Sequence, residues 1–140
     1  MTRGTLTTFV AATIAFAVVV SAGVQKGGVF TAQQAQAGKA LFAETCAGCH
    51  MPDLSGKDDA PPLAGVNFVS SWGTRSSKDL LDYMSTAMPP GGPSLPVEEY
   101  ASIAAYILQF NGAAAGTQAL NASTILPIGS VVSPRLDIVP

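Results

Sequence analysis

The feature that most constrains this chain is the five-residue run Cys-Ala-Gly-Cys-His at positions 46–50. Two cysteines three positions apart, with a histidine directly after them, are typical of covalent attachment of a c-type haem. Cys46 and Cys49 would each form a thioether to the haem, and the same turn would present an imidazole nitrogen of His50 to the iron. The run therefore predicts a domain organised around one covalently bound haem.

Other interpretations of the two cysteines fit the sequence less well. A structural zinc site normally needs four Cys or His ligands, whereas this chain has two Cys and one His. A thioredoxin-like redox pair is expected beside a strand–helix–strand pattern, which does not surround positions 46–50. A disulfide across two intervening residues would be strained or redox-active, and a thiol–disulfide protein without haem is kept as a separate hypothesis.

The first 22 residues predict export. Arg3 precedes an apolar segment, residues 9–20, which ends in small residues up to Ala22. This order is that of a secretory signal peptide, so residues 1–22 are interpreted as a leader cleaved after Ala22. The uncharged segment 4–25 approaches the ~20 residues that span a bilayer, so an uncleaved anchor is the alternative. Both interpretations place the rest of the chain outside the cytoplasm, and a periplasmic location is expected.

Charge argues against one class of partner. Without Arg3, six of the seven basic side chains remain against nine acidic ones, and they form no basic cluster. Nucleic-acid-binding domains normally carry a basic patch. We therefore expect no nucleic acid partner, and membrane attachment only if the N-terminal segment is not cleaved.

The remainder divides into a linker over residues 23–30, a helical domain over residues 31–112 and an extended tail over residues 113–140. Apolar periodicity and helix-forming composition predict three main helices in the domain. They are expected over residues 32–44, from Ser76 or Ser77 to Ala87, and from Pro96 to a stop at Asn111. Residues 51–67 are loop by composition, and Phe68 and Trp72 are expected in a short helical turn. No element is predicted in the tail.

Specific residues mark the helix ends. Thr31 and Gln34 have the form of a capping box, in which the Gln34 side chain returns to the start of the first helix. Pro89 ends the second helix, because the residue before a proline is pushed out of the α region. Gly38 is unfavourable inside a helix. Either the helix simply tolerates this glycine, or another helix approaches closely on the face that also carries Phe42.

Few residues can supply a second axial ligand to the iron. His50 is the only histidine, so a second imidazole is impossible. Thioether sulfur is the obvious alternative, and Met/His ligation raises the haem potential. Met1 lies in the leader and Met51 is adjacent to His50. Of the remaining two, Met84 lies on an apolar helix face and is more simply a core residue. Met88, which precedes two prolines, is therefore the preferred ligand.

Together these features resemble the class I cytochromes c over residues 31–112. The most specific marks are the motif at positions 46–50 and the Met88-Pro89 pair. The resemblance implies an all-α fold, a small cytochrome c-like domain of three main helices around one covalently bound haem c. It also implies that His50 and Met88 ligate the iron and that the domain transfers single electrons.

Further positions match the same family. The crossing of its first and last helices is matched by Gly38, Phe42 and Tyr106. Pro61 and Leu63 match its Pro-x-Leu sequence, in which the proline carbonyl accepts a hydrogen bond from the ligating histidine. The resemblance therefore implies that Pro61 orients His50.

A finer resemblance concerns the redox partner. Residues 88–92, 98–100 and 105–108 are similar to small cytochromes and haem domains that accept electrons from quinoprotein dehydrogenases. The resemblance implies an electron carrier or electron-transfer subunit rather than an enzyme. Its expected partners are a quinoprotein or other exported dehydrogenase and a terminal acceptor such as an oxidase. The alternative is a haem enzyme or gas sensor with an open sixth position, which requires that Met88 does not bind the iron.

Overall fold

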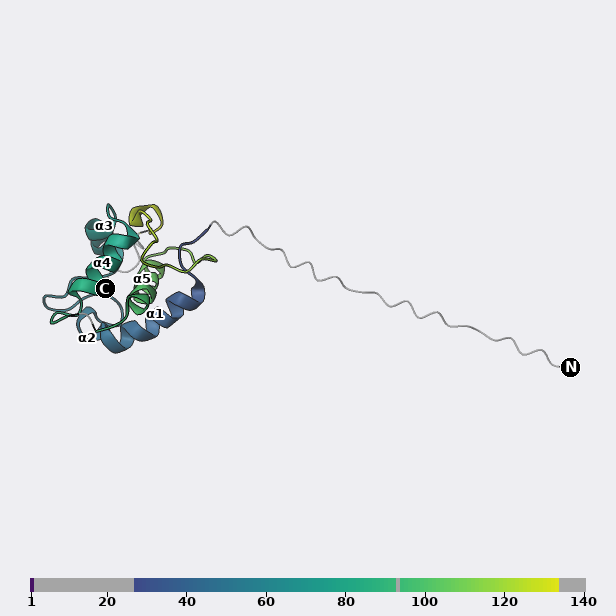
Figure 1. Ribbon diagram of the computed structural model, residues 1–140, viewed down its shortest axis with the longest axis horizontal. Helices are drawn as coiled ribbons and strands as arrows, with labels where there is room; N and C mark the ends of the chain where they lie inside the picture. Colours follow the sequence, from purple (N-terminus) through teal and green to yellow (C-terminus); the bar gives the residue numbers. More distant parts are fainter. Residues whose placement is uncertain (2–26, 93, 134–140) are drawn as a thin grey trace.

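The computed structural model describes residues 1, 27–92 and 94–133 (Figure 1). The leader predicted over residues 1–22 lies, apart from Met1, outside these described residues. Among the helices that the structure describes, none is both long enough and apolar enough to cross a membrane.

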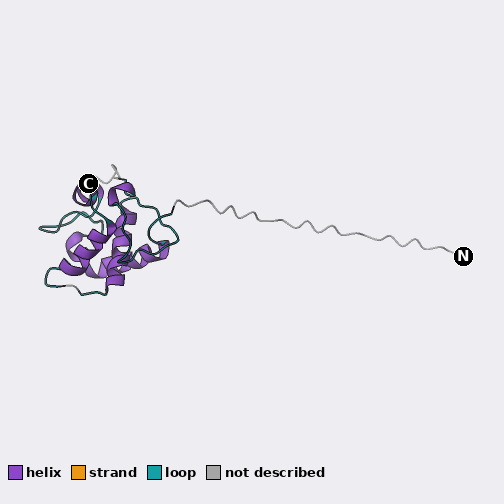
Figure 2. Cartoon of the chain, turned by 45° about the horizontal axis from the view of Figure 1, so that its top comes forward, coloured by secondary structure: helices purple, strands orange, loops and turns teal. Residues whose placement is uncertain are grey.

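Helices account for all the regular structure of the described residues (Figure 2). They are α1 (Ala32–Thr45), α2 (Ala47–His50), α3 (Gly65–Trp72), α4 (Ser77–Ala87), α5 (Val97–Phe110) and the short 3-10 helix η1 (Ile128–Ser130). The three predicted main helices correspond to α1, α4 and α5, so the all-α fold class is confirmed. α3 begins three residues before the expected turn, and α5 begins one residue after Pro96, which occupies the N-cap.

Side-chain caps set the starts of α1 and α4, and the cap of α1 differs in part from the prediction. Ser76 and Asp79 form a complete capping box at α4, since each side chain accepts a hydrogen bond from the other's backbone N–H. At α1, Thr31 Oγ1 accepts from the Gln34 N–H at 3.0 Å, as expected. The predicted return of the Gln34 side chain to the helix start is wrong, because its amide binds the backbone of Leu120.

α1 crosses α5 at very short range (Figure 1). A Cβ atom built on Gly38 would overlap the carbonyl oxygen of Ser102 in α5, so only glycine permits this approach. One turn further along α1, the ring of Phe42 packs against Tyr106 with centroids 5.4 Å apart. The close-approach interpretation of Gly38 is therefore confirmed, and the residues that resemble a helix crossing do form one.

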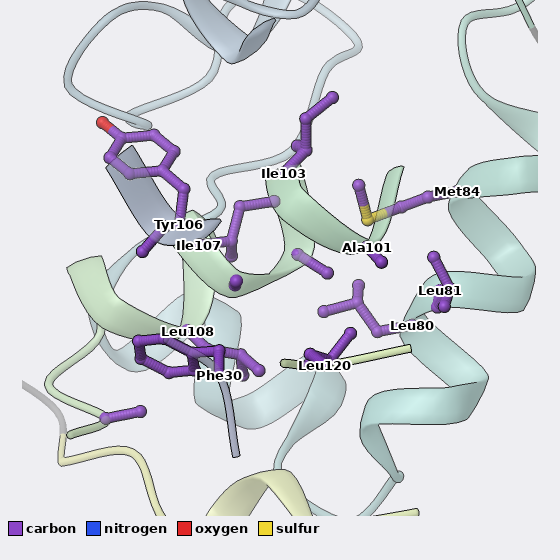
Figure 3. Packing of buried hydrophobic residues seen from close by; sticks show 14 of the residues in the cluster. Phe30, Leu80, Leu81, Met84, Ala101, Ile103, Tyr106, Ile107, Leu108 and Leu120 are labelled. Carbon is purple, nitrogen blue, oxygen red and sulfur yellow. The ribbon is translucent and has the colours of Figure 1, made fainter. Parts of the chain in front are cut away.

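The segment 113–133 packs onto the helices rather than extending away from them. Leu120 and Ile128 are at most 2% exposed. Figure 3 shows Leu120 in the same cluster as Phe30, which is fully buried at the end of the predicted linker. The two segments also meet through the backbone, because the Gly116 N–H donates to the Phe30 carbonyl at 2.7 Å. Apolar periodicity predicted no helix or strand here, because most of the segment has no regular structure.

Long-range hydrogen bonds hold this segment in place. Gln34 Nε2 donates to the Leu120 carbonyl at 2.7 Å, and the Leu120 N–H donates to Gln34 Oε1 at 2.8 Å. Ser77 Oγ donates to the Thr124 carbonyl at 2.8 Å. The Ile128 N–H donates to the backbone carbonyl of Arg75 at 3.0 Å, just before α4. The segment is thus bonded to both α1 and the start of α4.

Replacing Gly38 by alanine is expected to destabilise the fold. Alanine would gain about 1 kcal/mol in helix propensity, but its methyl group would force the two backbones apart, and overpacking typically costs about 1–3 kcal/mol. The net effect should be a lower urea midpoint. Gly27→Ala is the control, because a Cβ at Gly27 meets nothing within 4 Å. Equal midpoints for the two variants would contradict the crossing.

Gln34→Ala tests the attachment of the C-terminal segment. Each of its two bonds to Leu120 contributes about 0.5–1.5 kcal/mol net, so the free energy of unfolding should fall by roughly 1–3 kcal/mol. The matched control is Gln36→Ala, which removes an exposed glutamine from the same helix. Proteolysis should also cut the segment 113–133 faster in Gln34→Ala. A result indistinguishable from Gln36→Ala would rule out this anchoring.

Candidate haem site

All five α-helices contribute to the lining of one cavity of about 310 Å³. Most of the lining is apolar. It includes Phe42, Leu80, Leu95, Ile103 and Ile107. Cys46, Cys49 and His50 also line it, so the structure brings the three predicted attachment residues to a single apolar cavity.

The motif reaches the cavity because α1 is followed at once by a single helical turn. Cys46 is the C-cap of α1, and its N–H still donates to the Phe42 carbonyl at 2.9 Å. The His50 N–H then donates to the Cys46 carbonyl at 2.9 Å, which closes α2. A cysteine pair three positions apart and the following histidine therefore lie on one turn of helix.

Burial raises the pKa of the Cys46 thiol, and the neighbouring Cys49 adds to the increase. The Thr45 hydroxyl, 3.3 Å from Cys46 Sγ, acts in the opposite direction without cancelling it. Redox-active Cys-X-X-Cys pairs instead have a thiol with a lowered pKa. The environment of Cys46 therefore disfavours the thiol–disulfide hypothesis.

His50 has one ring nitrogen occupied and one free to ligate. Its Nδ1 lies 3.0 Å from the carbonyl oxygen of Pro61. A carbonyl can only accept, so Nδ1 carries the proton and the Nε2 lone pair remains available to a metal. The contact that the resemblance implied between Pro61 and His50 is present.

A buried amide supports the loop that carries Pro61. Asn111 is 2% exposed, and its Nδ2 donates to the Leu63 carbonyl at 2.9 Å. Its Oδ1 accepts from the Gly65 N–H at 2.8 Å. The sequence predicted Asn111 only as a helix stop. An asparagine at a helix end gives no signal for partners 46 and 48 residues away.

Two methionines reach the cavity. Of Met51, Met84 and Met88, the last two line it. Met84 is 7% exposed on α4, and Figure 3 shows its side chain directed from α4 toward α5. Met88 caps α4 with extended backbone, φ −123° and ψ 138°, so it departs from the helical face that Met84 follows. The cavity lining alone therefore does not distinguish Met84 from Met88, which are also the two ligand candidates that the sequence left.

An aromatic and cationic cluster lies beside the cavity. The Arg75 guanidinium carbon is 4.9 Å from the centroid of the Trp72 ring, and the Trp72 ring is 5.5 Å from that of Tyr83. All three side chains line the cavity. Arg75, which no sequence pattern indicated, could pair with a haem carboxylate.

This donor set fits haem better than a bare metal ion. Within residues 27–92 and 94–133, no group of three or more His, Cys, Asp or Glu side chains could hold a metal. A porphyrin supplies its own four nitrogens and needs only axial ligands from the protein. An apolar cavity with two thiols, one imidazole and a thioether meets that need.

Residues 33–107, more than half of the chain, match the family described as cytochrome C oxidase, cbb3-type, subunit III. The chain belongs to this cytochrome c family. With the spacing of Cys46 and Cys49, family membership identifies the cofactor of this cytochrome c domain as one covalently bound haem c. It also identifies haem-based electron transfer as the general function.

A solved structure is similar to this cytochrome c domain. It is the crystal structure of the sulfane dehydrogenase SoxCD from Paracoccus pantotrophus, with a TM-score of 0.55 and 27% sequence identity. The similarity covers 74% of this chain and 56% of the SoxCD chain, so the domain spans little more than half of that chain. No match was found among curated protein sequences. The resemblance to cytochromes c is confirmed, whereas the finer one to quinoprotein-associated cytochromes stays a prediction.

Covalent attachment can be tested by mass. The protein made with a haem-maturation system should exceed its polypeptide mass by one haem, and the haem should survive denaturation because thioethers are covalent. Replacing both Cys46 and Cys49 by alanine should give the bare polypeptide mass and a haem that organic solvent extracts. A bare mass for the unmutated protein would contradict the assignment.

Proposed function

We propose that this domain is an exported one-electron carrier or electron-transfer subunit whose haem iron is ligated by His50 and Met88. The observation that carries the proposal is the meeting, in one apolar cavity, of the motif cysteines, the oriented His50 and the methionine that ends α4. When bound, the haem supplies an iron that alternates between the ferric and ferrous states.

His50 is proposed as the proximal ligand. The hydrogen bond from Nδ1 to the Pro61 carbonyl fixes both the tautomer and the plane of the ring. Asn111 holds the following residues, Leu63 and Gly65, against the end of α5. The proposed proximal ligand is thus positioned by a loop that is itself anchored to the end of α5.

Met88 is proposed as the distal ligand. Its backbone leaves the helix at the cavity, and its side chain is half-buried there. Met84 is more deeply buried and belongs to the packed cluster of α4 and α5. A thioether favours ferrous iron, raises the potential and leaves no open position for a substrate. An open sixth position would instead support the alternative of a haem enzyme or gas sensor.

The partner is proposed to be an exported dehydrogenase, a quinoprotein or another class, that passes electrons through this domain to an oxidase or other terminal acceptor. The similarity to a sulfane dehydrogenase supports the first part, and the oxidase description of the family supports the second. The leader-like residues 1–22 support a periplasmic location. Electron-transfer encounters are weak and bury under about 1,200 Å², so we expect a transient complex.

Met88→Ala separates the carrier from the enzyme or sensor. Without a distal sulfur, the oxidised protein should lose the visible absorption of sulfur–iron(III) ligation, the reduced protein should bind carbon monoxide, and the potential should fall. Met84→Ala is the matched control. It should cost about 2–5 kcal/mol of stability for a buried methionine and keep the iron spectrum.

The reverse pattern, with Met84→Ala opening the iron and Met88→Ala leaving it closed, would refute the ligand assignment. An open iron in the unmutated protein would refute the carrier hypothesis as well, and would favour the enzyme or sensor.

A further inference from the structure

We propose that Tyr100 is a positioning residue for Met88, because its hydroxyl fastens Met88 and Ser94 to α5, and these are the two ends of a loop of which the structure describes residues 88–92 and 94. We call this segment the methionine loop. The inference rests on the proposed ligation of the iron by Met88, and concerns how the protein holds that ligand in place.

The Tyr100 hydroxyl uses its donor and an acceptor site at once. Tyr100 lies in the first turn of α5 and is 2% exposed. Its O–H donates to the Met88 carbonyl at 2.5 Å, and its oxygen accepts from the Ser94 N–H at 3.1 Å. A carbonyl cannot donate and a backbone N–H cannot accept, so the two directions are fixed. One buried hydroxyl therefore joins the first and last residues of the loop.

Met88 is held between two helices by its own backbone. Its N–H donates to the Met84 carbonyl at 3.1 Å, which ties it to α4. Its carbonyl accepts from Tyr100, which ties it to α5. With both sides of the residue fixed, the direction of its Cα–Cβ bond into the cavity is fixed as well. The side chain then has only its rotamers left to adjust.

The rest of the methionine loop offers little support of its own. Pro89 and Pro90 have no backbone N–H to donate. Gly91 and Gly92 have φ values of 110° and 123°, which glycine adopts without strain. The backbone bond described within the loop runs from the Gly92 N–H to the Pro89 carbonyl at 3.1 Å and does not reach a helix. Among the described residues of this loop, the side-chain bonds to α5 are therefore the two made by the Tyr100 hydroxyl.

Loss of the hydroxyl would favour a state in which the sulfur has left the iron. In Tyr100→Phe the Met88 carbonyl and the Ser94 N–H would both lose a buried partner, and such groups regain hydrogen bonds by moving toward water. An outward movement of the loop withdraws Met88 from the cavity. A purely structural Tyr100 would instead lower the stability of the whole domain and leave the iron ligation unchanged.

The experiment measures imidazole binding to the oxidised full-length holoprotein, because imidazole must displace the methionine sulfur. Apparent affinity scales with the fraction of protein in the sulfur-free state. We expect Tyr100→Phe to bind imidazole about tenfold more tightly, equivalent to about 1.4 kcal/mol, and its reduced form to bind carbon monoxide faster.

The matched control is Tyr106→Phe. It removes the same hydroxyl from the same helix, at a ring that packs against Phe42 and Phe110. Imidazole affinity should be unchanged in this variant. Equal affinities in Tyr100→Phe and the unmutated protein, with the sulfur–iron(III) absorption present in both, would overturn the positioning role alone. Absence of that absorption from the unmutated protein would overturn the proposed ligation itself.

A measurement on the unmutated protein decides the matter if Tyr100→Phe fails to incorporate haem. The Ser94 amide should be protected from hydrogen exchange, and saturating imidazole should remove the protection because the displaced methionine loop opens. An amide that exchanges freely from the start, or stays protected after imidazole has replaced the sulfur, would overturn the inference.

Discussion

The close crossing of α1 and α5 is the contact on which the site depends. Gly38 lets the α1 backbone touch that of α5 at Ser102. Because α1 ends directly at Cys46, the position of this crossing also fixes where the haem motif meets the cavity. A larger residue at position 38 would move the attachment cysteines relative to α5, which contributes Tyr100 and other lining residues. The glycine therefore determines site geometry as well as packing.

α5 anchors both proposed axial ligands, each through one buried polar side chain. At its C-terminal end Asn111 holds the loop whose Pro61 carbonyl orients His50. Near its N-terminal end Tyr100 holds the backbone of Met88. Buried polar groups of this kind are costly unless hydrogen-bonded. Asn111 bonds backbone atoms of Leu63 and of Gly65 at the start of α3, and Tyr100 bonds those of Met88 and Ser94. A single helix thus anchors the backbone segments on which both proposed ligands depend.

The segment 113–133 extends this framework beyond the core resemblance. Its bonds reach Gln34 on α1 and Ser77 at the start of α4. It also binds the backbone carbonyls of Gly73 and Arg75, in the turn between α3 and α4, and the side chain of Arg75 lies over the Trp72 ring beside the cavity. A small haem domain has limited apolar surface to bury. The segment adds Leu120 and Ile128 to the core and steadies one side of the cavity.

The sequence by itself determined the features that depend on local spacing. The run at positions 46–50 predicted the cofactor, and apolar periodicity predicted the three main helices. Gly38 inside a helix left close approach as one of two interpretations. Each of these signals lies within one or two turns of chain. Tertiary structure alone decided the hydrogen-bond partners of Gln34, Tyr100 and Asn111, because the local sequence around a polar side chain does not indicate which distant backbone group it will bind. It also decided that Leu120 and Ile128 in the segment 113–133 are buried, since irregular backbone acquires its contacts only from the helices on which it packs.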